Sequence, residues 1–340
     1  MEERVKSLVV ERPGRLSIET RAIPEPASGE IRIKVERAGI CGSDIHILHG
    51  SNPFARYPRV IGHEFFGRID KLGDGVHARL GARIVVDPVV ACGTCYPCSV
   101  GRPNVCAQLA VLGVHRDGGF SEYACVPAEN AHLLPDSVGD DQAPLVEPFS
   151  IAANITDHTS VFASDIALVY GAGPIGLTVI QVLKHVYGVK ELIVTDRIDQ
   201  RLEAARNNGA DRVINTAQTA LPAALADAGV KPTLIIDAAC NPSILAEAIE
   251  IASPAARIGL LGFSAEPSTI VQQKVTAKEL AIHASRLNSG KFAKVIDWFA
   301  SGTLQPERLI THRFGLDDYA IAFDTFEHNP TECCKVQLIF

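Results

Sequence analysis

The chain has 340 residues, a hydrophobic content of 47% and a formal net charge of -7 at pH 7. Its length is typical of two domains of ordinary size rather than of a single core. Because the basic footprint of a nucleic-acid-binding protein is missing, nucleic acid is not an expected partner.

The first residues show no targeting pattern. The chain opens with Met-Glu-Glu-Arg and runs directly into an alternating segment at residues 7–10, without the apolar stretch of a signal peptide. The longest apolar run, residues 166–180, is broken by glycine and proline and is short for a membrane span. We therefore expect a cytoplasmic location and no membrane partner.

Up to about residue 135 the chain consists of short β-type segments separated by glycine and proline. A high density of short strands and turns predicts a β-rich, barrel-like domain. The segments expected to form its strands are residues 7–10, 16–19, 31–38, 65–72, 83–86 and 120–126.

The pattern changes after Pro148, where short β-type runs alternate with helical stretches. Such alternation predicts a doubly wound parallel sheet. The runs are residues 166–170, 192–196, 212–215, 234–237 and 257–263, with a helix expected at 201–208 before Gly209.

From about residue 285 the pattern is mixed again, with a helix expected at 293–300 and a final strand at 336–340. We therefore predict a discontinuous first domain, residues 1–148 and 285–340, around a parallel-sheet domain of residues 149–284.

A G-x-G-x-x-G pattern lies between the β-type run 166–170 and a helical stretch. In this context the first glycine permits a tight turn, the second lets the backbone approach a pyrophosphate, and the third lets the helix pack on the strand. Phosphates then meet the positive end of the helix. The candidate cofactor-binding residues are Gly171, Gly173, Pro174, Ile175, Gly176, Asp196, Arg197 and Arg201.

Asp196 ends the next β-type run, twenty residues beyond Gly176. A carboxylate at this place accepts hydrogen bonds from the ribose hydroxyls of adenosine, which favours NAD. The same carboxylate repels the 2'-phosphate of NADP. Arg197 and Arg201 stand nearby and leave NADP open as an alternative.

Four cysteines follow the spacing C-x2-C-x2-C-x7-C, which lets them converge on one tetrahedral ion. Zinc held by four thiolates is a closed structural site, because no coordination position remains for a substrate. Two disulfides and a [4Fe-4S] cluster are the alternatives. The predicted ligands, in a lobe of about residues 88–110, are Cys92, Cys95, Cys98 and Cys106.

Cys41 and His63 come from separate segments upstream of the quartet, and both residue types suit zinc. Each also has an ordinary explanation. A buried cysteine often acts as a small apolar residue, and a histidine followed by Glu64 is often one partner of a hydrogen-bonded pair.

The order of these motifs resembles that of the zinc-containing medium-chain alcohol dehydrogenases, over essentially the whole chain. The motifs are Cys41-Gly-Ser-Asp-Ile-His46, Gly62-His63-Glu64, the cysteine quartet, Glu147-Pro148 and the glycine turn. The likeness is closest to the polyol and sugar-acid branch, which includes sorbitol, idonate and galactonate dehydrogenases. Residues 57–67, 87–92 and 112–123 look especially like one bacterial dehydrogenase.

The resemblance implies a GroES-like catalytic domain, a Rossmann NAD-binding domain, two zinc ions per chain and a homodimer or homotetramer. It implies a catalytic zinc ion on Cys41, His63 and a glutamate, which is either Glu147 in the matching segment or Glu64. It also implies that Ser43 begins a proton relay.

His46 would pass that proton to solvent. The alternatives are that Ser43 is a turn residue and His46 a polar surface group. Arg286 resembles an arginine that faces the substrate, where it could hold a carboxylate through paired hydrogen bonds. An arginine that binds pyrophosphate or forms a structural ion pair is the alternative. Phe54 and Phe120 are expected to line the pocket, unless they belong to the core.

The expected function is the NAD-dependent oxidation of a secondary alcohol on a sugar acid or polyol. An aldonate oxidised at C5, such as L-gulonate to fructuronate, is the first candidate. L-idonate, L-galactonate and sorbitol follow, and a threonine-type substrate is less expected. The alternative from another class is a zinc-binding regulator with a vestigial active site.

Overall fold

The computed structural model describes residues 4–340. The chain forms two compact units. The first holds residues up to Glu147 with Phe292–Ala300 and Leu309–Phe340, and the second holds Pro148–Lys291 with Ser301–Arg308. These units place residues 285–291 and 301–308 with the second one, whereas the sequence suggested a return at 285. The predicted domain boundaries themselves stay a prediction.

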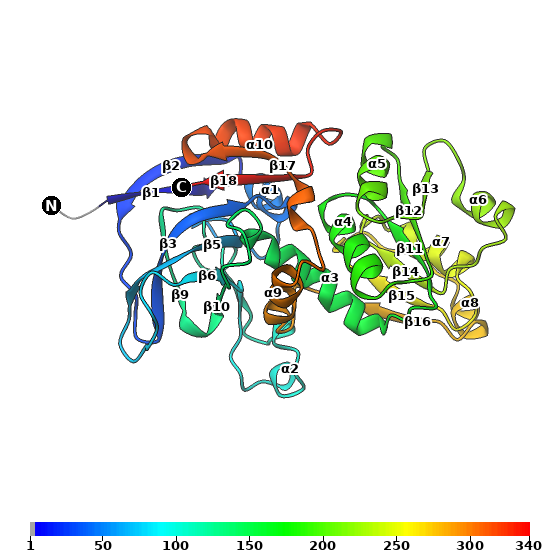
Figure 1. Cartoon of the computed structure of the whole chain (residues 1–340), viewed down its shortest axis with the longest axis horizontal. Helices are drawn as coiled ribbons and strands as arrows, with labels where there is room; N and C mark the ends of the chain where they lie inside the picture. The colour runs from blue at the N-terminus through cyan, green and yellow to red at the C-terminus, as the bar shows by residue number, and fades with distance from the viewer. Residues whose placement is uncertain (1–3) are drawn as a thin grey trace. The chain divides into compact units, whose positions relative to one another are not determined.

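The first unit is built on a seven-stranded sheet (Figure 1). Its order is β10 (Ala131–Leu133), β6 (Arg83–Val86), β5 (Glu64–Leu72), β3 (Glu30–Gly39), β18 (Lys335–Ile339) and β17 (Ile310–Gly315), with β9 (Tyr123–Pro127) also paired to β3. A second sheet has the order β2 (Arg15–Ala22), β1 (Arg4–Arg12) and β4 (Arg59–Val60), and a short one joins β7 (Val89–Val90) to β8 (Ala110–Val111).

The helices of this unit are short. They are α1 (Gly42–His49), α2 (Tyr96–Ser99), α9 (Phe292–Ala300) and α10 (Tyr319–His328). The last strand, β18, pairs antiparallel with β3, so that Gln337 lies opposite Gly39. This pairing brings the end of the chain beside the segment that carries Cys41.

The second unit contains a six-stranded, wholly parallel sheet. Its order is β13 (Arg212–Asn215), β12 (Glu191–Asp196), β11 (Ile166–Tyr170), β14 (Leu234–Asp237), β15 (Arg257–Leu260) and β16 (Ala281–Ala284). Chain order runs outward in opposite directions from β11 and β14, and ligands bind at such a switch point. The predicted fold class, a β-rich domain plus a doubly wound parallel sheet, is confirmed.

The helices of the second unit are α4 (Pro174–Gln181), which continues as a π-helix at Val182–Val186, α5 (Asp199–Asn207), α6 (Leu221–Asp227), α7 (Ile244–Ile251) and α8 (Gln272–Ala277). Helix α3 (Val146–Thr159) begins in the first unit and continues into the second. Several expected strands differ in extent. β1 and β2 are longer than the predicted residues 7–10 and 16–19, and β15 ends at Leu260. Residues 120–122 precede β9, because Phe120 donates its backbone N–H to Ile61 outside the ladder.

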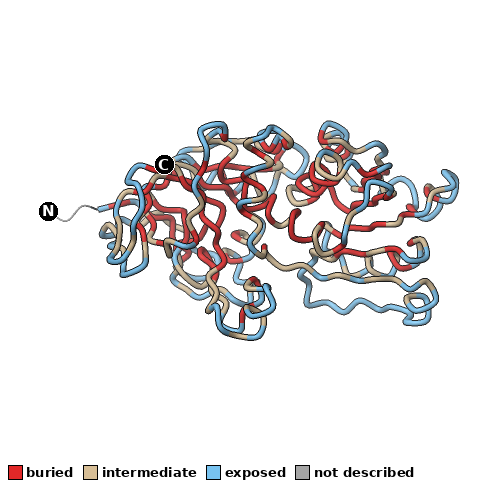
Figure 2. The backbone as a smooth tube through the Cα atoms, turned by 60° about the horizontal axis from the view of Figure 1, so that its bottom comes forward, coloured by how far each residue is buried: buried red, intermediate tan, exposed pale blue. Residues whose placement is uncertain are grey.

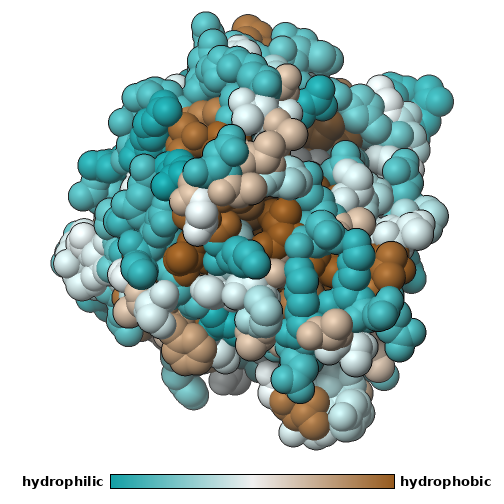
Figure 3. Space-filling model, turned by 90° about the vertical axis from the view of Figure 1, so that its right-hand side faces the viewer, coloured by the Kyte–Doolittle hydropathy of each residue, from teal (hydrophilic) through white to brown (hydrophobic). Residues whose placement is uncertain are grey.

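Burial follows the strands in both units, whereas the connecting loops are exposed (Figure 2). On the face drawn in Figure 3, hydrophobic areas are separated by hydrophilic ones. Within residues 4–340, the helices are all too short or too polar to cross a membrane.

Candidate metal and cofactor sites

The four cysteines of the predicted structural site converge. The Sγ atom of Cys106 lies 3.4 Å from that of Cys92 and 3.7 Å from that of Cys95, and Cys95 and Cys98 are 3.5 Å apart. These separations exceed the disulfide bond length of about 2.05 Å. Thiolates at about 2.3 Å from one tetrahedral ion stand about 3.8 Å apart, so the quartet fits zinc.

Backbone N–H groups surround the same sulfur atoms. Cys92 and Gln108 both donate their N–H to the Sγ of Cys106 at 3.3 Å, and Ala107 donates to Cys95 at 3.4 Å. Hydrogen bonds from the backbone and side chain of Thr94 lower the pKa of Cys92 to about 6. Donors of this kind favour the thiolate form that a metal requires.

A second cluster joins Cys41, His63 and Glu64, whose ligand atoms all lie within 4.8 Å of one another. Cys41 directly precedes α1, and Glu64 begins β5. Asp44 ties the two segments together, because its Oδ2 accepts the N–H of Cys41 at 2.9 Å and its Oδ1 accepts that of Gly62 at 3.3 Å. The sequence analysis did not single out Asp44.

The imidazole of His63 is oriented for a metal. Its Nε2 lies 3.4 Å from the hydroxyl of Ser43, whereas its buried Nδ1 faces Asp44 Oδ1 at 3.6 Å. A metal-binding histidine commonly uses one ring nitrogen for the ion and the other for a carboxylate. Burial lowers the pKa of His63, but the charges of Cys41 and Asp44 outweigh it and raise the pKa well above its ordinary value.

Glu64 is fully buried against a lysine from the other end of the chain. The Nζ of Lys335 lies 2.8 Å from each carboxylate oxygen of Glu64 and 3.1 Å from the carbonyl oxygen of Ile40. Burial lowers the pKa of Lys335, but the charge and hydrogen bond of Glu64, together with the charges of Cys41 and Cys334, outweigh it and raise the pKa. A carboxylate has about four lone-pair directions, so this pairing leaves Glu64 able to bind a metal as well.

Glu147, the other proposed ligand, lies in the first turn of α3 and is almost fully buried. Burial raises its pKa to about 8, while nearby His63 lowers it and nearby Glu64 raises it. Cys41, His63 and Glu64 offer a thiolate, an imidazole and a carboxylate to one point, and Glu147 is a further carboxylate close by. Zinc accepts all three kinds of ligand, so the residues present fit a zinc ion.

The two predicted relay residues lie on α1. Ser43 contacts His63 as described, and the Nδ1 of His46 lies 2.9 Å from the hydroxyl of Ser51. The roles of Ser43 and His46 stay predictions. Phe54 is partly exposed, with its ring 6.2 Å from that of His115. Phe120 is fully buried and meets Phe323 edge-on at 6.2 Å, as a core residue does, and its place in a substrate pocket stays a prediction.

The glycine turn of the second unit connects β11 to α4, as predicted. Gly171 has a φ of 89°, which favours glycine, and a Cβ on Gly176 would lie 1.9 Å from the carbonyl oxygen of Gly171. Helix α4 begins at Pro174 with Gly173 before it. The backbone therefore approaches closely at the place where a pyrophosphate is expected.

Asp196 is fixed beside this turn. Its Oδ2 accepts the N–H of Ala172 at 2.8 Å, and its Oδ1 accepts those of Arg197 at 2.7 Å and Ile198 at 3.1 Å. The guanidinium of Arg201 comes within 3.9 Å of the position that a Cβ on Gly173 would occupy. The carboxylate and an arginine thus flank the same turn.

Asp237 lies near the glycine turn, and Arg286 belongs to the same unit. Asp237 accepts the backbone N–H groups of Ala239 and Cys240 at 3.0 and 2.9 Å, and Ala239 packs against Gly171. The sequence analysis missed Asp237. The guanidinium of Arg286 lies over the ring of Phe263 at 5.5 Å, and its contact with a substrate stays a prediction.

Comparison with known proteins agrees with this geometry. Residues 27–136 match the alcohol dehydrogenase GroES-like domain, and residues 174–301 match the zinc-binding dehydrogenase domain. The chain is 60% identical to the starvation-sensing protein RspB of Escherichia coli K12 over 99% of both chains. The chain belongs to the zinc-containing medium-chain alcohol dehydrogenase family. The predicted resemblance to this family is confirmed, and the likeness to RspB extends over nearly the whole chain.

Relatives of known structure or activity span nearly the same length. A crystal structure of RspB from Escherichia coli CFT073, an alcohol dehydrogenase complexed with NADH, has a TM-score of 0.97, 60% identity and 99% coverage of both chains. Galactitol-1-phosphate dehydrogenase from Escherichia coli has a TM-score of 0.91 at 29% identity, covering 98% of this chain and 100% of its own. L-threonine 3-dehydrogenase from Anaeromyxobacter sp. is 33% identical, with 89% of each chain covered.

The protein is therefore a zinc-dependent dehydrogenase of the alcohol and polyol type. Asp44 and Lys335 contact the Cys41–His63–Glu64 cluster and were not predicted from the sequence. Asp44 stood inside the motif that contains Cys41 and His46, and its spacing of three residues from Cys41 was a usable signal. Lys335 had none, because its partner lies at the other end of the chain.

Proposed function

We propose that this dehydrogenase oxidises a secondary alcohol of a sugar acid, with NAD as the hydride acceptor. The first candidate reaction is the oxidation of an aldonate at C5, as in the conversion of L-gulonate to fructuronate. The observation that carries the proposal is the joint presence of two built sites, the Cys41–His63–Glu64 cluster and the glycine turn with Asp196 fixed beside it. NADH bound in the structure of RspB supports the choice of cofactor.

The chemistry divides between the bound groups and the chain. When bound, zinc makes the hydroxyl group of an alcohol acidic enough to lose its proton near neutral pH, and NAD accepts a hydride from the carbon that bears this hydroxyl group. In this proposal Ser43 accepts the alcohol proton, a role supported by the 3.4 Å distance between its hydroxyl and the Nε2 of His63. His46, on the same helix and bonded to Ser51, would pass the proton to solvent. Asp44 holds the Cys41 and His63 segments in register.

In this proposal Arg286 gives the enzyme its preference for sugar acids over neutral polyols. A guanidinium binds a carboxylate through two parallel hydrogen bonds, which sorbitol cannot offer. Runner-up substrates are L-idonate, L-galactonate and sorbitol. The threonine dehydrogenase relatives keep an amino acid among the compounds to test.

A panel of aldonates, polyols and L-threonine, followed by NADH formation with and without a zinc chelator, tests the proposal. We expect L-gulonate to be oxidised fastest and the chelator to abolish the rate. Arg286→Gln should raise the KM for L-gulonate by about 10–100-fold, the worth of a charge-assisted hydrogen bond, with a smaller effect on sorbitol. An equal effect on both would remove Arg286 from carboxylate binding.

The alternative from another class is a zinc-binding regulator, to which the name of the RspB relative points. A regulator has no need of Ser43, His46 and an intact cofactor turn together. If no compound of the panel is oxidised, the regulator becomes the better account.

We also propose a cytoplasmic location. We propose a homodimer or homotetramer as well, and light scattering of the purified protein would test that oligomeric state.

A further inference from the structure

The first unit contains a cavity of about 580 Å³ that the proposed reaction does not use. It lies between the β1–β2 hairpin, the segment that begins β4, the loop at residues 115–118 and strand β9. Its volume is ample for a small metabolite. Cys41, His63, Glu64 and the cysteine quartet are not among its lining residues, so it is separate from both metal clusters.

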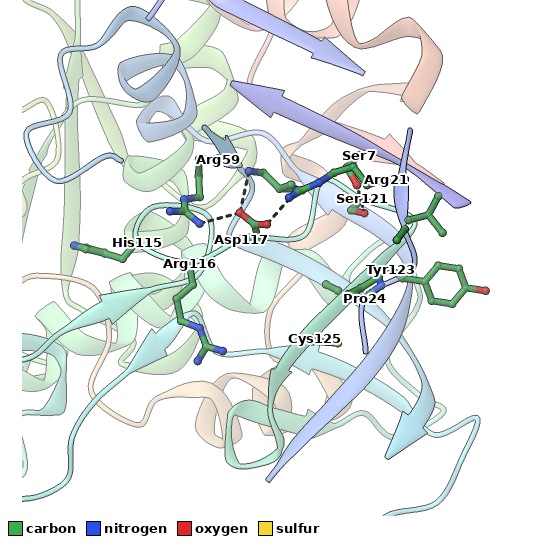
Figure 4. A pocket seen from close by; sticks show the side chains of 15 residues that line it. Ser7, Arg21, Pro24, Arg59, His115, Arg116, Asp117, Ser121, Tyr123 and Cys125 are labelled. Carbon is green, nitrogen blue, oxygen red and sulfur yellow. Dashed lines mark hydrogen bonds and ion pairs between the residues drawn. The ribbon is translucent and has the colours of Figure 1, made fainter. Parts of the chain in front are cut away.

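Arginine dominates the charge of this cavity. Arg21, Arg59 and Arg116 line it, and Asp117 is the one carboxylate among its described lining residues. Figure 4 shows Asp117 between Arg59 and Arg21, with Arg116 directed elsewhere. The Asp117 carboxylate accepts from Arg59 Nη1 at 2.8 Å and from Arg21 Nη1 at 3.1 Å. One negative charge is thus shared by two guanidinium groups.

Arg59 keeps unused donor capacity. Its side chain is only 17% exposed, and its buried Nε has no hydrogen-bond partner among residues 4–340. A guanidinium has five N–H donors in a fixed fork that matches carboxylate and phosphate oxygens. Asp117 accepts from Arg59 through Nη1 alone, so the rest of the fork is left to donate to an oxyanion in the cavity.

Hydroxyl groups extend the polar surface of the cavity. Ser7 and Ser121 face each other at 2.7 Å where β1 meets the segment before β9. Arg116 pairs with Glu30, which is not a lining residue. The arginine excess and the hydroxyl pair suit an anionic, hydroxylated molecule better than an apolar or cationic one.

We propose that this cavity is a binding site for a small oxyanionic metabolite, with a phosphate or carboxylate group held by Arg59 and Arg21. The ligand adds a second anion beside Asp117, which balances the two guanidinium charges. Phosphate esters and dicarboxylates share this chemistry, and two probes distinguish them: inorganic phosphate and malonate.

Calorimetric titration of the zinc-loaded full chain, saturated with NADH, tests the site. NADH occupies the pyrophosphate site of the second unit, so remaining anion binding must arise elsewhere. Chloride at equal ionic strength is the reference. We expect binding of phosphate, of malonate, or of both, and the better probe identifies the class. The proposal is overturned if the binding heats of phosphate and of malonate are both no greater than the heat measured with chloride.

Substitutions of the lining arginines test whether the anion binds in the cavity. Arg59→Gln and Arg21→Gln should each lower the affinity for the anion at least about tenfold, the contribution of one charge-assisted hydrogen bond. Arg15→Gln, on the same strand as Arg21 but outside the cavity, is the matched control and should change nothing. Asp117→Asn should tighten binding, because it removes the competing charge.

Circular dichroism and thermal unfolding of each variant check that the fold persists. Arg21 is 44% exposed, so Arg21→Gln keeps the test decisive if Arg59→Gln does not fold. Equal affinity in Arg21→Gln and Arg15→Gln would overturn the assignment.

Discussion

Lys335 Nζ lies 2.8 Å from both carboxylate oxygens of Glu64, although 271 positions separate the two residues in the chain. Both side chains are buried at the metal cluster of the first unit. The pair links the last strand, β18, to the start of β5. The end of the chain therefore helps to build the site whose other residues come from its first half.

Lys335→Met should lower the free energy of unfolding by about 3–5 kcal/mol, because it leaves the Glu64 carboxylate buried without its partner. Urea denaturation measures the loss. Lys274→Met removes an exposed lysine from its pair with Glu250 and should have little effect. The double variant Lys335→Met/Glu64→Gln should recover part of the stability. Equal losses for Lys335→Met and Lys274→Met would contradict a buried, interdependent pair.

Zinc affinity distinguishes the two glutamates. Glu64→Gln should weaken zinc binding at the catalytic cluster more than Glu147→Gln, because Glu64 is the glutamate that groups with Cys41 and His63 within 4.8 Å. For Glu147→Gln we expect a loss of about 10–100-fold, the effect of an outer partner. Competition with a chromogenic chelator gives both values, with the cysteine quartet as internal reference. The reverse order would make Glu147 the third ligand.

Ser43→Ala should reduce turnover by about 10²–10⁴-fold, because it removes the group that accepts the alcohol proton. Zinc content and NADH binding should be unchanged. His46→Ala should reduce turnover less than Ser43→Ala, since solvent can replace a residue at the exposed end of the relay. Ser99→Ala, an exposed serine on α2, serves as the control. If Ser43→Ala turns over at the parent rate, Ser43 has no part in the mechanism.

Asp196→Asn should raise the KM for NAD about tenfold or more. It should also lower the ratio of kcat/KM with NAD to kcat/KM with NADP. The amide keeps one acceptor oxygen for the backbone but loses the charge that repels a 2'-phosphate. Asp199→Asn is the matched control, because Asp199 lies in the first turn of α5 and bonds Asn215 and Gln218 instead. Steady-state kinetics with both cofactors measures the effect. If the ratio of kcat/KM with NAD to kcat/KM with NADP is unchanged, Asp196 is not the source of the preference for NAD.

Local patterns predicted much of the fold. Residues 166–170 and 234–237 are strands with the predicted bounds, because short apolar runs between turn residues define buried parallel strands. The edge strand at residues 212–215 also has its predicted bounds. The edge strand β16 and helix α10 were not predicted. β16 is only partly buried and α10 has a weak apolar face, so neither carries a strong periodic signal.

Long-range pairing decided the rest. The metal ligands were recognisable because their residue types and short spacings carry the chemistry, and Cys92, Cys95, Cys98 and Cys106 did so most clearly. Lys335 and the cavity around Arg59 depend on strands brought together from distant segments. Their charges become meaningful only after β18 has paired with β3 and the β1–β2 hairpin has met the segment before β9.

We propose that the Cys41 cluster performs the chemistry and that the cysteine quartet supports the fold. Turnover of L-gulonate with NAD by Cys41→Ser, with zinc content measured on the same sample, tests this directly. We predict a folded protein that keeps the quartet's ion, loses the other and shows no turnover, because the two clusters share no residue. Turnover at the parent rate in a Cys41→Ser sample that retains one zinc ion per chain would contradict the account.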